Sequence, residues 1–227
     1  MKLGVLFSGG KDSYLAMQMA SEQHQVSCLL TINSSNKDSW MFHTPAIEWT
    51  KLQSESLGIS QIIQKTEGIK DAELVDLLKL VKRAKNQYSI QGIVTGALAS
   101  TYQSTRIQKI CNDLGLWCFN PLWQLSQENL LRLLIDSEIS SVITGIAAEP
   151  FDESWLGKEI NSYTVDELLL YSKKYRINPA GEGGEFESLV IDSPMFEKKL
   201  EIISSKKHYS NFSGRLEIRE AKLICIF

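Results

Sequence analysis

Apolar and polar positions along the first half of the chain switch repeatedly between the spacing of strands and the spacing of helices. A continuous apolar run over residues 3–7 predicts a strand, and the pattern after it predicts a helix over residues 13–22. A second apolar run over residues 26–32 ends in the polar residues 33–36, which favours another strand followed by a loop. The order of strand, helix and strand predicts parallel strands joined by right-handed helical crossovers.

The same alternation continues to residue 119. The expected elements are a helix over 46–57, a strand over 59–63, a helix over 71–88, a strand over 91–95, a helix over 101–114 and a strand over 116–119. The helix over 71–88 is strongly periodic, because Leu74, Leu77 and Val81 fall on one apolar face. This repetition predicts an α/β fold, in which helices flank a parallel sheet.

Beyond Pro121 the pattern loosens. The expected elements are a helix near 127–137, a strand at 141–146, a helix near 165–175 and a strand-rich end after residue 186. We therefore predict two domains, an α/β domain over residues 1–123 and a smaller α+β domain over residues 124–227 that faces the substrate.

The composition is that of an ordinary globular protein. With 227 residues, of which 43% are hydrophobic and 22% charged, the chain can bury a core in one or two domains. Its formal net charge of -3 gives no general electrostatic reason to bind DNA or other nucleic acid. A basic cluster over residues 79–85 is interpreted as the solvated face of a helix.

Export, membrane and metal signals are missing from the sequence pattern. The chain starts at Met1 and enters a strand at once, with no apolar segment long enough for export or membrane spanning, so we expect a cytoplasmic protein. The four cysteines include no Cys-x-x-Cys pair, which indicates free thiols rather than zinc or a redox dithiol. The three histidines are equally scattered and favour no metal site.

The turn between the first predicted strand and helix carries the clearest chemical signal. It consists of Ser8, Gly9, Gly10, Lys11, Asp12 and Ser13. The glycines permit a tight turn with exposed N–H groups, and Ser13 is expected to cap the next helix, whose N-terminus attracts anions. The pattern is typical of a phosphate-binding loop, although the Walker spacing Gly-x-x-x-x-Gly-Lys-Ser/Thr is absent. The alternative is an ordinary strand-to-helix turn.

Ligands of parallel α/β sheets bind beyond the carboxyl ends of the strands. The loops over residues 8–13, 33–43 and 96–106 are expected to meet at that edge and to face one nucleotide. The stretch over 33–43 is interpreted either as an active-site loop or as a plain surface loop.

A second informative run precedes an apolar strand near the end of the chain. Its residues are Gly181, Glu182, Gly183, Gly184, Glu185, Phe186, Glu187 and Ser188. Glu185 and Glu187 would share one strand face, and paired carboxylates repel each other unless a cation or a proton lies between them. Magnesium, ammonium or a substrate cation would fit such a pair, and the alternative is a solvent-exposed acidic turn.

The first run resembles the signature loop of the ATP pyrophosphatases (PP-loop enzymes), which cleave ATP between its α and β phosphates and attach AMP to a substrate oxygen. Together, the two runs resemble the diphthine–ammonia ligase family. Further markers of that family are Gly96-Ala97, Tyr102-Gln103 with Arg106, Pro121-Leu122-Trp123 and Ser154-Trp155-Leu156-Gly157. The resemblance implies a HUP-type, Rossmann-like parallel sheet for residues 1–123.

The resemblance also implies an activity. It is the ATP-dependent amidation of diphthine, a modified histidine of translation elongation factor 2, with ammonium, through an acyl-adenylate, to give diphthamide, AMP and pyrophosphate. ATP and Mg²⁺ are the implied cofactors. The expected partners are diphthine-bearing elongation factor 2 and ammonium, with a homo-oligomer, a dimer, as the expected assembly and neither membrane nor DNA involved.

Residue roles follow from the resemblance as hypotheses. The nucleotide is assigned to Ser8, Gly9, Gly10, Lys11, Asp12, Ser13, Gly96, Tyr102 and Arg106. Asp12 is also the candidate for orienting magnesium. Catalysis is assigned to Asp12, Glu182, Glu185 and Glu187, because carboxylates can hold ammonium and accept the proton that makes ammonia nucleophilic.

Two other functions stay open from the residues alone. One is a different PP-loop adenylating ligase, acting on another carboxylate or on tRNA, although sulfur transfer to tRNA generally needs paired cysteines and Cys111 and Cys118 are the nearest pair. The other is a non-catalytic ATP or AMP sensor. No Cys-His pair that would release ammonia from glutamine stands out, so free ammonium is the more economical nitrogen source.

Overall fold

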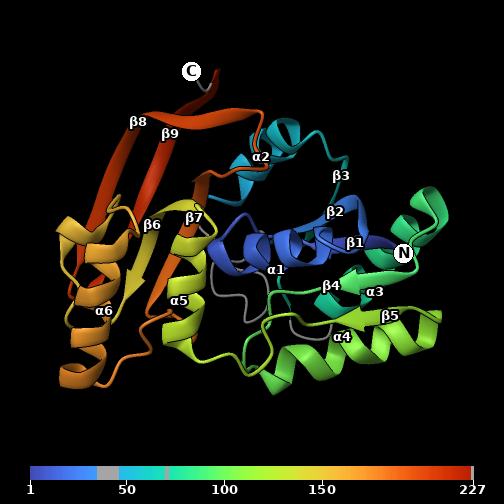
Figure 1. The fold of residues 1–227 in the computed structure, drawn as a ribbon, viewed down its shortest axis with the longest axis horizontal. Coiled ribbons are helices and arrows are strands. Elements are labelled where there is room, and N and C mark those ends of the chain that lie inside the picture. Colours follow the sequence, from blue (N-terminus) through green and yellow to red (C-terminus); the bar gives the residue numbers. More distant parts are fainter. Residues whose placement is uncertain (35–45, 70–71, 226–227) are drawn as a thin grey trace.

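A five-stranded parallel sheet, in the order β3-β2-β1-β4-β5, forms the N-terminal half of the molecule (Figure 1). The computed structural model describes residues 1–34, 46–69 and 72–225. The strands are β1 (Lys2–Leu6), β2 (Gln25–Ser34), β3 (Gln61–Thr66), β4 (Gly92–Val94) and β5 (Trp117–Phe119). The predicted Rossmann-like α/β architecture is confirmed.

Helices cover both faces of this sheet. They are α1 (Lys11–Ser21), α2 (Thr50–Leu57, after a 3₁₀ turn at Ile47–Trp49), α3 (Ala72–Tyr88) and α4 (Thr101–Leu114). Leu30 of β2 packs with α3 and α4 on one face, whereas its neighbour Leu29 packs with α1 on the other. The chain order reverses between β1 and β4, so α1 and α4 start at the switch point where ligands of such sheets bind.

The C-terminal half is built on a four-stranded antiparallel sheet in the order β7-β6-β9-β8. Its elements are α5 (Gln127–Asp136), β6 (Ser140–Ala147), a 3₁₀ turn at Glu153–Trp155, α6 (Ser162–Tyr175), β7 (Phe186–Asp192), β8 (Lys198–Ser210) and β9 (Ser213–Cys225). The predicted strand-rich end is confirmed. The strands β8 and β9 form a long hairpin, while β7 is the edge strand that lies closest to α1 (Figure 1).

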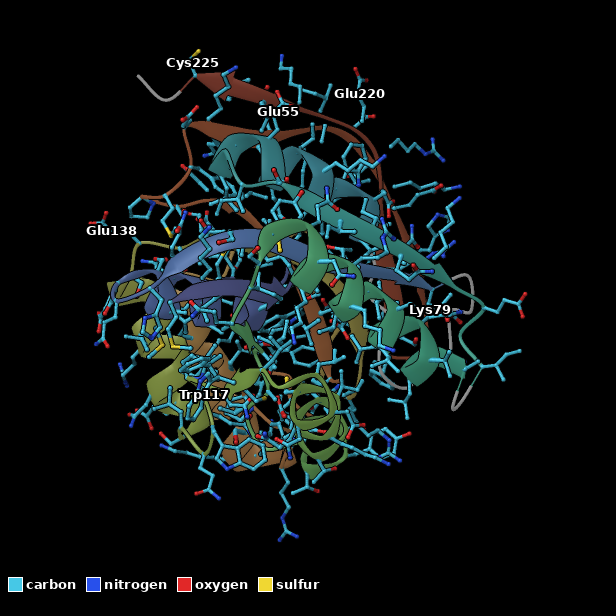
Figure 2. All side chains as sticks on the ribbon, turned by 90° about the vertical axis from the view of Figure 1, so that its right-hand side faces the viewer. Glu55, Lys79, Trp117, Glu138, Glu220 and Cys225 are labelled. Atoms are coloured by element: carbon cyan, nitrogen blue, oxygen red, sulfur yellow. The ribbon has the colours of Figure 1, made fainter. Side chains whose placement is uncertain are left out.

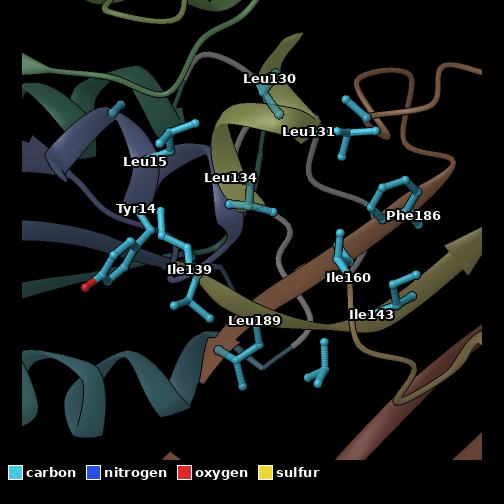
Figure 3. Close-up of a cluster of buried hydrophobic side chains, with 14 of the residues drawn as sticks. Tyr14, Leu15, Leu130, Leu131, Leu134, Ile139, Ile143, Ile160, Phe186 and Leu189 are labelled. Atoms are coloured by element: carbon cyan, nitrogen blue, oxygen red, sulfur yellow. The ribbon is translucent and has the colours of Figure 1, made fainter. Parts of the chain in front are cut away.

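One continuous hydrophobic core joins the two sheets. Tyr14 and Leu15 of α1 lie beside Leu134 of α5 and Leu189 of β7, as Figure 3 shows. All four side chains are almost fully buried. Since α1 packs against both halves, the loop that precedes it is held between the two sheets. The domain boundary between residues 123 and 124 stays a prediction.

Some expected elements differ in detail from the structure. The predicted helix over 46–57 starts as a 3₁₀ turn before α2, and the predicted loop over 33–43 lies outside the described residues except for its first two, which end β2. The basic cluster of α3 is exposed, with Lys79 pointing outward in Figure 2. In the part of the chain that the structure describes, no helix has the length and apolar character needed to cross a bilayer.

Candidate active site

A cavity of about 590 Å³ opens at the carboxyl end of β1. Three segments far apart in the sequence provide most of its polar lining: the loop over residues 8–13, the stretch from the end of β4 into α4, and the glycine-rich run that leads into β7. Of the residues predicted from the sequence, the cavity is lined by Ser8, Gly10, Lys11, Asp12, Ser13, Gly96, Glu182 and Glu187. The two runs that carried the sequence interpretation therefore share one site.

Helix α1 starts two residues earlier than predicted, and the expectation that Ser13 caps it is wrong. The N-cap residue is Gly10, which provides no capping side chain. The Ser13 hydroxyl instead accepts a hydrogen bond from the Ser8 amide (3.2 Å) and contacts the carbonyl of Gly10 (3.1 Å). The loop is thus closed by its own serine, and the start of α1 faces the cavity without a side-chain cap. A helix N-terminus of this kind binds anions.

Gly96 brings the start of α4 against the first turn of α1. A Cβ atom at this position would lie 2.7 Å from both the carbonyl carbon of Asp12 and the amide nitrogen of Ser13. Both contacts are with backbone, which cannot move aside as a flexible side chain would. Only glycine therefore permits the two loops to meet at this distance.

The substitution Gly96→Ala is expected to push the two loops apart. We expect a loss of about 1–3 kcal/mol in the free energy of unfolding, as for other overpacked sites, together with weaker nucleotide binding. Denaturant unfolding and nucleotide titration measure the two effects. Gly115→Ala is the matched control, because Gly115 caps α4 with φ +60 and open space around it, far from the cavity lining. It should cost about 1 kcal/mol of stability without changing nucleotide affinity.

The edge strand β7 holds the loop from the other side. Ser188 accepts a hydrogen bond from the Lys11 amide (3.2 Å), and the Val190 amide donates one to the carbonyl of Gly9 (2.9 Å). Glu187 lies directly before Ser188 and lines the same cavity. These two hydrogen bonds fix the position of β7, and with it Glu187, relative to the loop over residues 8–13.

Lys11 is the one cationic side chain among the described residues that line this cavity. It is 3% exposed, and its ammonium group donates hydrogen bonds to both carboxylate oxygens of Asp12 (3.0 and 2.8 Å). The same ammonium group lies 5.2 Å from the centre of the Phe186 ring. Buried cations need such partners, and this one supplies a fixed positive charge at the base of the loop.

Two of the cavity's carboxyl groups have raised pKa values. Burial raises the pKa of Glu187 to about 7, with a further upward push from Asp12 and an opposing pull from Lys11. Burial also raises the pKa of Glu182, whose carboxylate accepts a hydrogen bond from the Ala99 amide (3.2 Å). A carboxyl group that titrates near neutral pH can both accept and return a proton.

Glu185 does not join Glu187 on a strand face, so that expectation is wrong. The strand starts only at Phe186, after Gly184 with φ +86 has changed the chain direction. The two carboxylate oxygens of Glu185 accept hydrogen bonds from the amides of Asn178 (2.9 Å) and Gly183 (2.8 Å). Glu185 thus braces the glycine-rich turn beside the cavity, and its catalytic assignment stays a prediction.

Tyr102 and Arg106 lie outside the lining of the cavity. The Arg106 guanidinium stacks 3.4 Å from the centre of the Tyr102 ring and donates a hydrogen bond to the Tyr102 carbonyl (3.1 Å). The face of α4 that borders the cavity carries Gln103 and Ile107, and Ser100 caps the helix. The nucleotide-binding roles of Tyr102 and Arg106 stay predictions.

Several lining residues were given no role from the sequence. Ser188 and Gln103 belong to the runs and markers singled out there, and Thr95 directly precedes Gly96, so adjacency to assigned residues was the available signal. The apolar part of the lining consists of Leu6, Phe7, Leu30, Ile32, Ile47 and Ile107. An apolar lining of this kind suits an aromatic ring.

The fold and site define a Rossmann-like α/β protein in which the uncapped start of α1 shares a cavity with the carboxyl groups of Glu182 and Glu187. Family models match both halves of the chain: the diphthamide synthase N-terminal domain over residues 1–118 and the diphthamide synthase C-terminal domain over residues 126–224. The chain therefore belongs to the diphthamide synthase, or diphthine–ammonia ligase, family, which confirms the resemblance.

Individual relatives carry the same name. The diphthine–ammonia ligases of Homo sapiens and Mus musculus are 36% and 35% identical to the chain, and each match covers 91% of this chain and 84% of the relative. That of Schizosaccharomyces pombe is 32% identical over 95% of this chain and 38% of its own length. Among solved structures, a predicted tRNA methyltransferase subunit from Methanocaldococcus jannaschii aligns over 86% of this chain and 98% of its own, at 16% identity and a TM-score of 0.41.

Proposed function

We propose that this protein amidates diphthine on translation elongation factor 2, using ATP and ammonium and releasing AMP and pyrophosphate. The main support is that one cavity is lined both by the loop over residues 8–13 and by the acidic run over residues 181–188. The names of the relatives support the same reaction. None of the described features favours the sensor or a sulfur-transferring enzyme over this reaction.

ATP fits the cavity with its phosphates on the loop. The loop offers the hydroxyl of Ser8, the amide of Gly10 and the start of α1, all of which suit phosphate oxygens. Apolar lining residues such as Leu30 and Ile107 are proposed to pack against the adenine. A volume of about 590 Å³ lies in the usual range for small-molecule sites.

Asp12 is the residue proposed to hold Mg²⁺. Its carboxylate is 33% exposed and lines the cavity, and carboxylate oxygen is the ligand type that Mg²⁺ prefers. Among the described residues, no cluster of three or more His, Cys, Asp or Glu side chains could hold a metal. This fits an ion shared between one carboxylate and the phosphates of a nucleotide. When bound, Mg²⁺ would neutralise phosphate charge.

The reaction needs an activated carboxyl group. A carboxylate resists nucleophilic attack because of its charge, whereas an acyl-adenylate has a good leaving group. In the proposed first step, the diphthine carboxylate attacks the α phosphate and pyrophosphate leaves. Lys11 and the start of α1 would stabilise the charge that develops on the phosphates, a contribution that is often the largest in catalysis.

The carboxyl groups that line the cavity are proposed to bind ammonium and remove a proton from it. Glu187, Glu182 and Asp12 together attract a cation, and a Glu187 carboxylate with a pKa near 7 can take one proton from ammonium. The resulting ammonia attacks the acyl carbon, and AMP leaves with the bonding electron pair. Nitrogen then carries one proton too many, and it loses this second proton to solvent as the neutral amide forms. The first proton, taken from ammonium, remains on Glu187 until solvent removes it.

The protein substrate must insert a side chain into this cavity. Gly183 and Gly184 line it and are exposed, so the rim is free of bulky side chains there. This opening supports access for a residue that remains attached to a folded factor. The dimer and the cytoplasmic location are proposed on the resemblance and the composition alone.

Glu185→Gln separates the bracing role of Glu185 from a chemical one. Glutamine keeps one acceptor oxygen and puts a donor against the second backbone amide, so the turn should lose about 1 kcal/mol of stability. We expect ATP affinity to be unchanged. The amidation rate should fall only modestly, in proportion to the loss of stability. Denaturant unfolding and amidation assays measure both quantities. A large loss of amidation at unchanged stability would instead assign Glu185 to the chemistry.

The proposed function is tested with purified protein, ATP, Mg²⁺, ammonium and diphthine-bearing elongation factor 2, omitting one component at a time. We expect AMP and pyrophosphate only in the complete mixture, together with an acid-to-amide mass change on the factor. Pyrophosphate release with another acceptor and not with the factor would point to a different ligase. ATP binding without turnover under any condition would point to a sensor.

A further inference from the structure

We propose that Gln53 of α2 is a positioning residue that fixes the Gly9–Gly10 peptide so that the Gly10 N–H faces the phosphate site. The proposal rests on the proposed function only in that the cavity binds the phosphates of a nucleotide. Nothing in the sequence pattern connects Gln53 to the loop, since 44 residues separate it from Gly9.

The Gln53 side chain is fully buried and makes two hydrogen bonds with one amide nitrogen. This nitrogen donates to the carbonyl of Gly9 (2.9 Å) and to the carbonyl of Val190 (2.7 Å). The Val190 amide also donates to the carbonyl of Gly9 (2.9 Å). Since both partners of the side chain are acceptors, only the NH₂ end of the amide can face them. Gln53 therefore joins α2, the loop and β7 at one point.

The hydrogen bonds from Gln53 and from the Val190 amide together hold the peptide between Gly9 and Gly10 in one direction. In a trans peptide the carbonyl and the N–H project in opposite directions. Holding the Gly9 carbonyl toward Gln53 and Val190 turns the Gly10 N–H away from them, toward Ser8 and the cavity, where it donates a long hydrogen bond to the Ser8 hydroxyl (3.5 Å) that a phosphate oxygen could replace. The N–H then offers a donor to a phosphate oxygen.

The hydrogen bonds to the Gly9 carbonyl are needed because a peptide between two glycines rotates easily. Neither residue has a Cβ atom, so a flipped peptide has little steric cost. A flip would direct a carbonyl oxygen at the phosphates and replace an attraction by a repulsion. Gly9 has φ +78, and a Cβ atom there would lie 2.4 Å from the Gln53 side-chain oxygen, so Gln53 fills the space beside the glycine.

Helix α2 carries Gln53 on a buried face that is polar throughout. Its buried residues are Thr50, Gln53 and Ser56, spaced three apart. Ser56 accepts a hydrogen bond from the Lys198 amide (3.1 Å), and its own carbonyl accepts one from the Glu197 amide (2.9 Å). Thr50 accepts one from the Gln61 side chain (2.8 Å). The helix is thus anchored at both ends, and the position of Gln53 is fixed between them.

The test compares phosphate-bearing and phosphate-free ligands in Gln53→Met, which keeps the side-chain length and removes the donor. We expect the affinities for ATP and for inorganic pyrophosphate to fall about tenfold or more, as for loss of an oriented hydrogen bond, while adenosine affinity is unchanged. Gln64→Met is the control, because the hydrogen bonds of the Gln64 side chain are with the Lys65 carbonyl (2.9 Å) and with Arg83, and Gln64 does not line the cavity. It should keep the wild-type affinity for all three ligands.

The outcomes separate this proposal from the proposed function. If wild type binds neither ATP nor pyrophosphate, the proposed function fails. If wild type binds both and Gln53→Met binds them equally well, or loses adenosine affinity to the same extent, the positioning role is overturned. Should Gln53→Met not fold, the shorter but still polar Gln53→Asn replaces it, with the same selective loss of phosphate ligands expected.

Discussion

Glu187→Gln is expected to give a protein that is more stable than wild type at alkaline pH and nearly inactive in amidation. Partial burial raises the pKa of Glu187 from 4.5 to about 7, so above neutral pH the native state must hold a carboxylate with reduced access to water. A neutral glutamine of the same shape removes that cost. The site thus sacrifices stability for chemistry, as functional sites often do.

The direction of the pH effect follows from the raised pKa. Between pH 4.5 and about 7 the native state binds a proton at Glu187 that the unfolded chain has lost. The stability from this bound proton is complete below pH 4.5 and is lost as the pH rises through about 7. The variant should therefore gain about 1–3 kcal/mol over wild type at pH 8 and much less at pH 5. Urea unfolding at both values measures this, with the exposed Glu55→Gln as control (Figure 2).

The same variant should lose amidation by about 100-fold or more, since a positioned general base contributes on that order. In wild type, the rate should rise as Glu187 ionises near pH 7, in addition to the rise from free ammonia in solution. Glu187→Gln should show only the rise that comes from free ammonia. Its pH profile therefore gives the background against which the contribution of Glu187 is measured. Equal rates and equal pH profiles in the two proteins would remove Glu187 from the mechanism.

Lys11→Met is expected to have the next largest effect. It removes the one cation in the described lining of the cavity and leaves Asp12, Glu182 and Glu187 facing the phosphates. ATP affinity should fall about 30-fold or more, because a charge-assisted hydrogen bond is replaced by net repulsion. The pKa of Glu187 should rise further, since Lys11 now lowers it.

Calorimetric titration with ATP and with adenosine measures the Lys11→Met effect, and adenosine affinity should change little. Lys79→Met is the matched control, because Lys79 is exposed on α3 and its ion pair with Asp76 (3.0 Å) lies away from the cavity. Its ATP affinity should match that of wild type. Unchanged ATP affinity in Lys11→Met would exclude Lys11 from the phosphate site.

Most of the fold could be predicted because local pattern and tertiary environment agree in it. The helix over 101–114 was predicted with its observed bounds, since Ser100 and Gly115 provide a cap at each end. The start of α1 was misplaced because serine is a strong N-cap residue. Here the Ser13 hydroxyl instead holds the Ser8 amide, a contact that depends on loop closure rather than on propensity.

The site could be predicted where its residues lie within the two short runs, and less well where it depends on tertiary contacts. Strand alternation predicted that Glu185 and Glu187 share a face. Gly184 has a left-handed conformation, and β7 begins only at Phe186, so Glu185 lies outside the strand. The Arg106 side chain stacks on Tyr102 and does not line the cavity. Residue spacing along α4 does not predict which face of the helix borders the cavity. Gln53 reaches the loop only through the packing of α2 between the two sheets.

The most direct test of the central claim follows the nitrogen atom. Diphthine-bearing elongation factor 2 is incubated with the protein, ATP, Mg²⁺ and ¹⁵N-ammonium, and mass spectrometry of the factor is compared with the AMP released. A single cavity that adenylates and then amidates predicts labelled diphthamide and one AMP for each amide formed. AMP and pyrophosphate with an unmodified factor, or an amide without the label, would contradict it.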